Sequence, residues 1–451
     1  MIESEYLKSI GARILSEAND LKRTAESMAV DLNIDSEYLQ QVISGNCTRK
    51  DTFKIINLIE KTYPVDSGDL LLINDDCQNG ILYFSADKSK KTSRVFDRVN
   101  KQNKRTPYYE YRDTAMSKVS PFKPEWIKEL RTVSDSNPSN PDVAYNNGHF
   151  MHQITYFVGP VNFYFIVNGE KHCKEMNTGD SNYITPYIPH SFTNRDASQE
   201  AYIVAITFGG DVRRTQKELY ALGVEKVKKY SLDIRNENKA ISQLIQQHMN
   251  NENLTKEMIS DRVDVDKLLH VDRRKTLSEL EEIADLLNIE PSDLMIPKYN
   301  KDHEVVVHEK SEIEAINYPN DKNVIYKIYH GSRVNKMPNL KSFDIHILGT
   351  KVKNKDLFNT SLHSYIYNYS ETDILMVYVN DGEQHTQLLR ARDSVYVQPF
   401  VKYGFQNNLD GGLSSVFVAR VSGGINFCTQ KELSYFLDIE RVASENTCWF
   451  D

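Results

Sequence analysis

The sequence has little cysteine and no long apolar run. Its five cysteines are scattered and form no CxxC pair, a pattern that indicates free thiols in a reducing compartment. No run of eighteen apolar residues occurs, so we expect no membrane-spanning helix and no membrane partner. The first ten residues, MIESEYLKSI, are charged and lack an apolar core, which excludes a secretory signal. The expected location is therefore the cytoplasm.

An excess of positive charge is also lacking. The 451 residues carry 55 basic and 63 acidic side chains, a net charge of -8, so the surface as a whole repels nucleic acid. The length is sufficient for two to four domains with a sizeable core. The 26 tyrosines favour half-buried strands and polar pockets over a helical bundle.

Residues 10–70 have a helical pattern. Within them, residues 21–39 predict a helix, a break at Asn33 and a second helix capped by Asp35 or Ser36, which resembles the helix-turn-helix of small repressors. A helix that reads DNA needs basic and amide side chains, whereas this one is acidic near its start. We therefore expect a packing or dimerisation module and no DNA partner. A transcription regulator with a ligand-sensing barrel is the alternative, and a gel shift would test it.

A basic and aromatic segment follows at residues 85–115. Arg105 comes shortly before Tyr108, Tyr109 and Tyr111. Two interpretations stay open: the segment is a solvated linker, or it delivers a cation and phenols to an anion. Which of the three tyrosines would contact that anion is open as well.

The two halves of the sequence repeat each other. NGEKH, from Asn168, recurs as DGEQH, from Asp381, and the segment after it recurs at the same offset of 213 residues. The helical pattern from Thr52 recurs from Thr276. We predict an α+β chain with the order helices, barrel, helices, barrel. The predicted segments are a helix-turn-helix-like module at 1–75, a linker or arm with candidate contact residues at 76–125, a catalytic barrel at 126–235, a second helical module at 236–298 and a structural barrel at 299–451.

The candidate site lies in the first barrel. NNGHFMHQITYF, from Asn146, and YITPYIPHSF, from Tyr183, flank an alternating run and a glycine turn, which is typical of a small β-barrel with polar side chains inside. Such a barrel would bring His149 and His190 together. The constant offset maps the candidate site onto different residues in the second barrel: His149 onto Leu362, Gln153 onto Ile366, His190 onto Tyr403 and Asn146 onto Asn359. We therefore expect one active site per chain.

Two histidines in one barrel favour a mononuclear iron site. Non-haem iron that activates O2 is usually held by two His and one carboxylate, with open positions for substrate and O2. The position about six residues before His190 would carry that carboxylate, but it holds Ile184, and its neighbour Thr185 cannot replace a carboxylate. The nearest third ligand is Gln153, through its amide oxygen.

The spacing between His149 and Gln153 sets a geometric condition. Residues four apart on a regular strand share a face but lie about 13 Å from each other. They could hold one ion only if the chain bends or bulges, and Gly148 makes an irregular start to the strand plausible. His152 is the competing ligand, although it has the opposite strand parity. Ordinary polar barrel residues without a metal are the alternative to both.

Three motifs carry a resemblance to a known family: NNGH from Asn146, Y-x-x-P followed by PHS from Tyr183 to Ser191, and LKRTA from Leu21. Over essentially its whole length the chain resembles the 2-hydroxyethylphosphonate dioxygenase and methylphosphonate synthase family. The resemblance implies a tandem repeat of a helix-turn-helix-like module plus a cupin (double-stranded β-helix) barrel, with the second cupin degenerate. It also implies Fe(II), O2 and a small phosphonate substrate, without 2-oxoglutarate.

The resemblance also implies roles for single residues. His149 and His190 resemble the iron ligands and Asn146 resembles a phosphonate-binding Asn. Lys22 resembles a lysine that reaches a neighbouring subunit's site, which implies a homo-oligomer, a dimer or a tetramer. Arg105 and Tyr111 resemble the Arg and Tyr that contact the phosphonate in this family, although the spacing between them differs by two residues. The expected site is catalytic Gln153, Lys22 and Tyr111, substrate-binding Lys22, Arg105, Tyr111, Asn146 and Tyr183, and metal-binding His149, Gln153 and His190.

The third ligand separates the branches of this family. The dioxygenase branch has Glu there, whereas the methylphosphonate synthase branch has Gln, which Gln153 fits. The resemblance therefore implies conversion of 2-hydroxyethylphosphonate and O2 to methylphosphonate and bicarbonate. Hydroxymethylphosphonate and formate are the alternative products. A sugar or nucleotide-sugar isomerase on the same barrel, which needs no metal, is the competing enzyme class.

Overall fold

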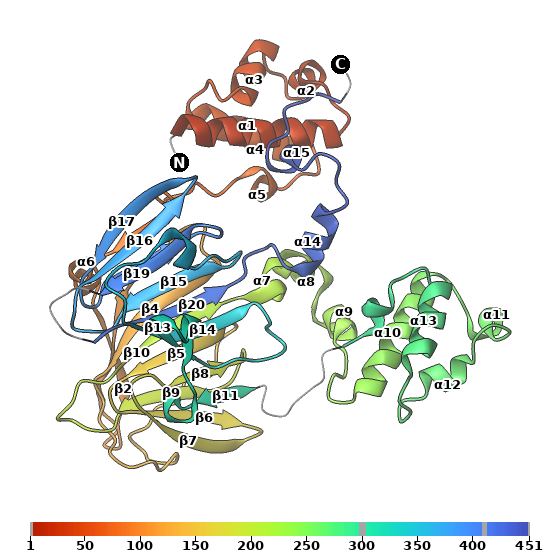
Figure 1. The fold of residues 1–451 in the computed structure, drawn as a ribbon. Helices are drawn as coiled ribbons and strands as arrows, with labels where there is room; N and C mark the ends of the chain where they lie inside the picture. The colour runs from red at the N-terminus through yellow and green to blue at the C-terminus, as the bar shows by residue number, and fades with distance from the viewer. Residues whose placement is uncertain (1–2, 297–303, 408–412, 450–451) are drawn as a thin grey trace.

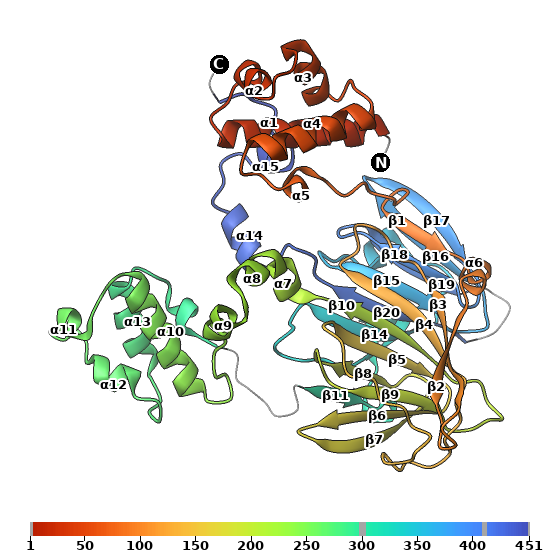
Figure 2. The same cartoon turned by 180° about the vertical axis from the view of Figure 1, so that it is seen from behind.

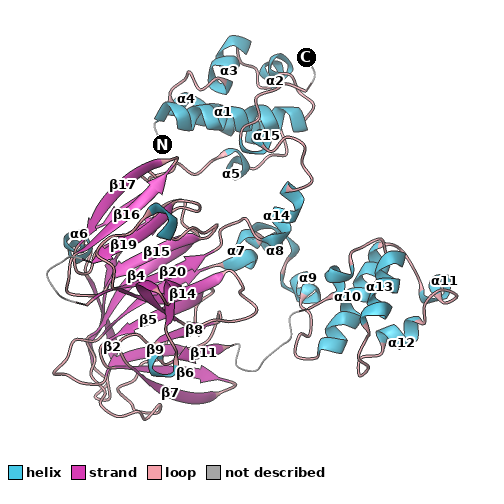
Figure 3. Ribbon diagram, in the orientation of Figure 1, coloured by secondary structure: helices cyan, strands magenta, loops and turns pink. Residues whose placement is uncertain are grey.

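The computed structural model describes residues 3–296, 304–407 and 413–449. Two β-sandwiches pack against each other, one helical module covers the outer end of the second sandwich, and another helical module stands to the side (Figures 1 and 2). Figure 3 shows that helices and strands are largely segregated. The mixed helix-and-sheet class predicted from the sequence is confirmed. The predicted boundary between 298 and 299 lies outside the described residues.

The amino-terminal module is helical, as predicted. Its helices are α1 (Glu3–Asp20), α2 (Ala25–Asp31), α3 (Ser36–Ile43), α4 (Arg49–Thr62) and α5 (Ser67–Leu70). Thr24, Asp35 and Thr48 each accept a hydrogen bond from the backbone N–H three residues later, which caps α2, α3 and α4. Ile10 and Ile14 on α1 are fully buried one helical turn apart, so the core follows the helical period.

A second group of helices follows the first sandwich. It comprises α7 (Gly210–Arg214), α8 (Gln216–Leu222), α9 (Val224–Val227), η1 (Lys228–Tyr230), α10 (Glu237–Asn251), α11 (Lys256–Ile259), α12 (Val265–Leu269), α13 (Leu277–Leu286) and η2 (Pro291–Leu294). Thr276 and Glu279 form a capping box at the start of α13. The ammonium of Lys275 is satisfied internally, by His270 O, Asn238 O and Ser242 Oγ at 2.8 to 2.9 Å.

The first sandwich has a seven-stranded and a three-stranded sheet. Their orders are β11-β8-β5-β10-β4-β3-β2 and β7-β6-β9. The strands are β2 (Arg94–Val99), β3 (Arg105–Asp113), β4 (Phe122–Glu129), β5 (His152–Val158), β6 (Val161–Val167), β7 (Glu170–Met176), β8 (Ser181–Ile184), β9 (His190–Asn194), β10 (Tyr202–Phe208) and β11 (Val305–His308). Phe157, Phe163 and Ile203 are fully buried between the two sheets.

The second sandwich has the same architecture, with sheet orders β1-β18-β15-β20-β14-β13-β12 and β17-β16-β19. Its strands are β1 (Ile81–Phe84), β12 (Ile316–Asn320), β13 (Asn323–His330), β14 (Leu340–Ile347), β15 (His363–Asn368), β16 (Ile374–Asn380), β17 (Glu383–Leu389), β18 (Ser394–Val397), β19 (Lys402–Asn407) and β20 (Ser414–Val421). Short helices η4 (Lys310–Glu312) and η5 (Asn354–Asp356) lie in its connections.

The predicted linker at 76–125 is mostly regular structure. It contains β1, α6 (Ala86–Lys91), β2, β3 and the start of β4. Strands β2 to β4 extend the large sheet of the first sandwich, whereas β1 joins the large sheet of the second. The segment therefore belongs to both sandwiches.

The two sandwiches exchange one strand each. β1 precedes the first sandwich in the chain but pairs with β18 of the second, and β11 precedes the second but pairs with β8 of the first. Equivalent carboxylates hold the chain just after each exchanged strand. Asp393 Oδ1 accepts from Ala86 N–H at 2.7 Å, and Asp180 Oδ1 accepts from Lys310 N–H at 2.8 Å. The exchange is thus reciprocal.

Strand parity sorts the side chains of β5 between two cores. Ile154 and Tyr156 face the large sheet of the other sandwich, whereas Phe157 faces the interior of its own. Gln153 has the same parity as Phe157. Gln153 therefore points into the interior of the first sandwich, whereas its strand neighbour Ile154 lies in the contact between the two sandwiches.

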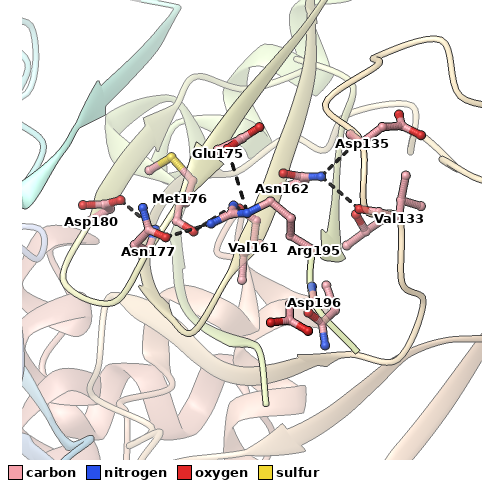
Figure 4. Close-up of polar contacts among 12 residues, drawn as sticks. Val133, Asp135, Val161, Asn162, Glu175, Met176, Asn177, Asp180, Arg195 and Asp196 are labelled. Atoms are coloured by element: carbon pink, nitrogen blue, oxygen red, sulfur yellow. Dashed lines mark hydrogen bonds and ion pairs between the residues drawn. The ribbon is translucent and has the colours of Figure 1, made fainter. Parts of the chain in front are cut away.

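One end of the first sandwich is closed by polar contacts, which Figure 4 shows. Arg195, just after β9, donates to Val161 O at 3.0 Å and to Asn177 Oδ1 at 2.7 Å. Asn162 donates through Nδ2 to the carbonyl oxygens of Val133 and Asp135, at 3.0 and 2.9 Å. These bonds fix the small sheet and the loop that leads toward the site.

The carboxyl-terminal segment crosses from the second sandwich to the amino-terminal module (Figure 1). It contains α14 (Phe427–Leu433) and α15 (Glu440–Ala443). Asn19 on α1 donates to Thr447 O at 3.0 Å and accepts from Trp449 N–H at 3.1 Å, which holds the segment in place. No helix of the described part is both long enough and apolar enough to cross a membrane.

Candidate metal centre

The chain bends just before β5, and this bend builds the site. Gly148 has a φ of 72°, and a Cβ there would lie 2.4 Å from the carbonyl carbon of Tyr187, so only glycine fits. Tyr187 N–H donates to His149 O at 2.8 Å, which holds His149 beside the strand instead of on it. His149 Nε2 consequently lies 3.2 Å from Gln153 Oε1. The bend that the four-residue spacing requires is present.

His190 begins β9 and reaches the same point from the small sheet. Its Nδ1 lies 2.9 Å from Ile188 O. Because a carbonyl only accepts, Nδ1 carries the proton and Nε2 directs its lone pair into the site. Burial lowers the pKa of His190 to about 4, so the ring is neutral. The ring centroids of His149 and His190 are 5.2 Å apart.

Asn146 is oriented by the backbone around it. Its Oδ1 accepts from His190 N–H and from Gly148 N–H, both at 2.9 Å. The amide oxygen is therefore occupied, and the Nδ2 group points into the site, 3.0 Å from His190 Nε2. Asn146 thus presents a donor to whatever binds there.

Gln153 offers its oxygen to the same point. Its Nε2 donates to Thr155 Oγ1 at 2.9 Å, so Oε1 is the atom that faces His149. Imidazole nitrogens of His149 and His190 and the amide oxygen of Gln153 thus line the same point of one cavity. Because lone pairs that face one another repel, a metal ion or a proton between these atoms would stabilise them. The donor set fits a divalent first-row metal, and imidazole suits Fe(II). His149 Nδ1 is buried and has no hydrogen-bond partner among the described residues.

A cavity of about 220 Å³ opens beside these three side chains. It has one cationic, one acidic and several hydroxyl groups on its walls. The lining residues are Arg98, Tyr109, Tyr111, Glu125, Ile127, Ala144, Asn146, His149, Met151, Gln153, His190, Phe192, Ala205 and Thr207. Burial raises the pKa of Tyr111 to about 12, so its phenol remains a proton donor at neutral pH. Burial also raises the pKa of Glu125, against the opposing effect of Arg94 at 3.8 Å.

Comparison with known proteins gives the family. No protein-family model matches the chain. The chain is 37% identical over 459 aligned residues to a methylphosphonate synthase of Nitrosopumilus maritimus, an alignment that covers 99% of this chain and 96% of the relative. The chain belongs to the methylphosphonate synthase family.

Solved structures agree with this family assignment. The structure is similar to that of Streptomyces albus HEPD with its substrate 2-hydroxyethylphosphonate and Fe(II) bound, with a TM-score of 0.90 and 28% identity over all of both chains. It is also similar to native PhpD with cadmium atoms, with a TM-score of 0.73 and 15% identity, over 96% of this chain and 98% of the other. The second likeness supports the cupin-type β-sandwich fold alone.

Three predicted site residues of this family member lie outside the cavity: Tyr183, Arg105 and Lys22. Tyr183 faces the second sandwich, where its hydroxyl lies 2.7 Å from His152 Nδ1, because its strand neighbour Ile184 takes the interior face. His152 stacks on Phe208 on that same outer side, so it does not compete with Gln153 as a ligand. Tyr183 therefore does not line the cavity that holds His149, Gln153 and His190.

Arg105 is likewise outside the cavity. It is exposed at the start of β3, and its guanidinium donates to Asp97 O at 3.1 Å. Arg98, on the neighbouring strand β2, lines the cavity instead. The basic segment does deliver a cation and two phenols, Tyr109 and Tyr111, so the interpretation as an anion-binding arm fits better than a solvated linker.

Lys22 is not part of the cavity in the same chain. Its φ is 57°, its ammonium donates to Asp20 O at 3.2 Å, and it lies 5.1 Å from the ring centroid of Trp449. Sequence reasoning also missed Glu125, Thr207 and Met151. Alternation along β4 and β10 was the signal that could have found the first two.

Proposed function

We propose that this family member is a methylphosphonate synthase. It uses Fe(II) and O2 to cleave the C–C bond of 2-hydroxyethylphosphonate, which yields methylphosphonate and bicarbonate. The observation that carries the proposal is the convergence of His149, His190 and the amide oxygen of Gln153 in one cavity. Ile184 stands where a carboxylate ligand would be expected, so the ligand set is neutral.

The three ligands leave room for chemistry beside them. His149, Gln153 and His190 would hold Fe(II), which when bound supplies the site's capacity to bind and activate O2. Ile188 O fixes the tautomer of His190, and Thr155 fixes the amide of Gln153. These contacts position the ligand atoms before any metal arrives. The substrate supplies the electrons, so the proposal needs no 2-oxoglutarate.

The cavity supplies donors for a phosphonate dianion. Asn146 Nδ2 is directed inward, Arg98 brings a positive charge, and Tyr111 retains its proton because burial raises its pKa. Charge-assisted hydrogen bonds from such groups are the strong ones in a partly dry site. The volume of about 220 Å³ suits a substrate of seven non-hydrogen atoms. We assign Asn146, Arg98 and Tyr111 to phosphonate binding.

The neutral third ligand accounts for the proposed product. Gln153 leaves the centre one unit more positive than a glutamate would. We propose that this difference favours return of hydrogen to the phosphonate carbon over its oxidation. The carbon that bears the hydroxyl group is oxidised to bicarbonate, and both oxygen atoms of one O2 are needed to balance the products.

A second product assignment has an observation in its favour. The chain has a TM-score of 0.90 to Streptomyces albus HEPD. A dioxygenase of that kind would give hydroxymethylphosphonate and formate from the same substrate and the same O2. Both outcomes use the same site, so only the products separate them.

The test is reconstitution without oxygen. The protein is loaded with Fe(II), mixed with 2-hydroxyethylphosphonate and exposed to air, and the products are read by phosphorus NMR. We expect methylphosphonate that depends on both Fe(II) and O2. Hydroxymethylphosphonate as the main product would favour the alternative, and an unchanged substrate spectrum would refute both.

We further propose that the chain arose as a tandem repeat of a helix-turn-helix-like module and a cupin barrel, with the second barrel degenerate and structural. The proposed units follow the predicted ones with three changes: β2 to β4 and β11 belong to the first barrel, β1 belongs to the second, and 210–230 belong to the second group of helices. The matching sheet orders and the reciprocal strand exchange support this. Five free thiols support a cytoplasmic location.

We also propose a homo-oligomer in which Lys22 serves a neighbouring subunit's site. Support comes from the position of Lys22 outside its own chain's cavity. Subunit mixing tests it, with Lys22→Ala protein combined with His190→Ala protein. Activity restored in the mixture above both parents requires that one subunit supplies Lys22 and the other the metal ligands. A mixture no more active than its parents would exclude the contribution in trans.

A further inference from the structure

A second cavity lies against the wall of the candidate metal site. It has a volume of about 450 Å³ and sits where the two sandwiches meet. The chain just after β10, at Gly209 and Gly210, lines one side, and the equivalent chain after β20, at Ser422 and Gly423, lines the other. Met151 lines both this cavity and the metal cavity. One side chain therefore stands between the two spaces.

The second cavity is strongly basic. Lys118, Lys123, Arg213 and Arg214 line it, and the described residues of its lining include no carboxylate. Arg214 pairs with Asp211. Lys118, Lys123 and Arg213 form no ion pair within 4.0 Å among the described residues. The protein as a whole has a net charge of -8, so this is a local concentration of positive charge in an acidic molecule.

The two cavities are lined by residues of the same two neighbouring strands, β4 and β10. Lys123 and Glu125 share a face of β4 about 7 Å apart, and the first lines the basic cavity while the second lines the metal cavity. Thr207, which lines the metal cavity, donates to Lys123 O at 3.1 Å across the β4–β10 pair. A ligand that moves from Lys123 to Thr207 would thus pass from the basic cavity to the metal cavity.

Met151 is suited to be a movable wall. Arg213 Nη1 contacts its Sδ at 3.2 Å, and Met151 lies just before β5, outside the strand. An unbranched side chain with three rotatable bonds can swing aside without a backbone change. The contact with Arg213 places a cation at the point where an anion would pass.

We propose that the basic cavity is the entrance by which the anionic substrate reaches the metal site, and that Met151 separates entrance from site. The identity of the anion as a phosphonate rests on the proposed function. Clefts lined by one sign of charge raise the encounter rate of an opposite charge by roughly 10-fold to 1000-fold, and salt suppresses the effect. We therefore expect the basic cavity to raise the association rate constant of the substrate.

The test measures arrival directly. The protein is loaded with Co(II) without oxygen, and the change in its visible absorption on mixing with 2-hydroxyethylphosphonate is followed by stopped flow. The variant is the triple substitution Lys118→Gln, Lys123→Gln and Arg213→Gln, all at exposed positions. The matched control is the triple substitution Lys322→Gln, Lys351→Gln and Lys353→Gln, which removes the same three charges at exposed lysines of the second sandwich.

At low ionic strength we expect the association rate constant of the triple variant to fall by about tenfold or more, with a flatter dependence on salt. The control should match the native protein. Association and salt dependence equal to native in the triple variant would overturn the entrance. A native protein whose Co(II) spectrum does not respond to 2-hydroxyethylphosphonate would instead refute the proposed function.

Met151→Phe tests the wall separately. A bulkier, stiffer side chain should slow association and dissociation in the same proportion, because a wall raises the barrier in both directions. The affinity, given by the ratio of the two rates, should stay within about twofold of native. Unchanged rates, or a changed dissociation rate alone, would show that substrate does not pass Met151.

Discussion

The two sandwiches share a fold but differ at the same three interior positions. Pairing with β8 places Gln153 opposite Ile184, and the equivalent pairing with β18 places Ser364 opposite Val397. Tyr187 N–H donates to His149 O, and Phe400 N–H donates to Thr360 O. The second sandwich thus has Thr360, Ser364 and Tyr403 where the first has His149, Gln153 and His190.

The second sandwich fills the equivalent space with a cation of its own. Arg420, at the position of Thr207, donates through Nε and Nη2 to Tyr403 OH at 3.2 and 3.0 Å. Tyr403 OH donates in turn to Ser364 Oγ at 3.2 Å. The guanidinium also lies 5.5 Å from the ring centroid of Phe358. The interior of the first sandwich has a cavity that suits a metal ion, whereas the guanidinium of Arg420 occupies the equivalent place in the second.

The largest expected difference concerns metal and turnover. His190→Ala removes an imidazole ligand, so we expect bound iron to fall from about one per chain to near zero and turnover to fall at least about 10³-fold. Tyr403→Phe, at the equivalent position of the second sandwich, should leave both unchanged. Elemental analysis and phosphorus NMR measure the outcome. Equal losses in the two variants would break the comparison.

Product identity should change next. Gln153→Glu restores a negative ligand with little change in size, so the iron should stay bound while the ratio of methylphosphonate to hydroxymethylphosphonate falls by about tenfold, or 1.4 kcal/mol. Phosphorus NMR gives the ratio and elemental analysis the occupancy. Unchanged methylphosphonate at full iron occupancy would show that ligand charge does not select the product.

Stability should respond in the second sandwich alone. Arg420→Leu leaves the Tyr403 hydroxyl without its donors and removes the contacts of the guanidinium with aromatic rings, which we expect to cost about 1–3 kcal/mol. Denaturant unfolding measures the loss, and iron content serves as the control. Lower iron occupancy in this variant would mean that the two interiors are not independent.

The smallest effect concerns the exchanged strands. Asp180→Asn and Asp393→Asn each replace one of two accepting oxygens, so we expect each to lower the unfolding free energy by about 1 kcal/mol. Asp393 should cost slightly more, because it also accepts from Tyr83 OH at 2.6 Å. Denaturant unfolding of the paired variants measures the difference. No loss in either would show that the carboxylates do not hold the exchanged strands.

Local patterns predicted much of the fold and three of the side chains that line the cavity, His149, Gln153 and His190. Two-residue alternation identified strands, and the glycine before His149 identified the bend. The constant offset of 213 was wrong for β15, because the chain from Ser364 to the start of β16 at Ile374 is two residues longer than the equivalent chain from Gln153 to the start of β6 at Val161. Leu362 and Ile366 are therefore not the equivalents of His149 and Gln153. Such a difference leaves the surrounding motifs aligned and becomes visible only from strand pairing.

Long-range pairing limited the rest of the prediction. The exchange of β1 and β11 depends on contacts between residues more than 100 positions apart, which no local pattern encodes. The choice between Arg98 and Arg105 depends on a register shift between Phe96 and Asp97, which changes which side chains of the β2–β3 pair face inward. Spacing along the chain could not determine it.

The strand exchange has a consequence for any attempt to separate the two sandwiches. A fragment ending before β11 would expose the backbone of β8 as a raw sheet edge, a template for aggregation. A fragment lacking β1 would expose β18 in the same way. Each sandwich therefore depends on a strand from the other half of the chain to cover one edge of its large sheet.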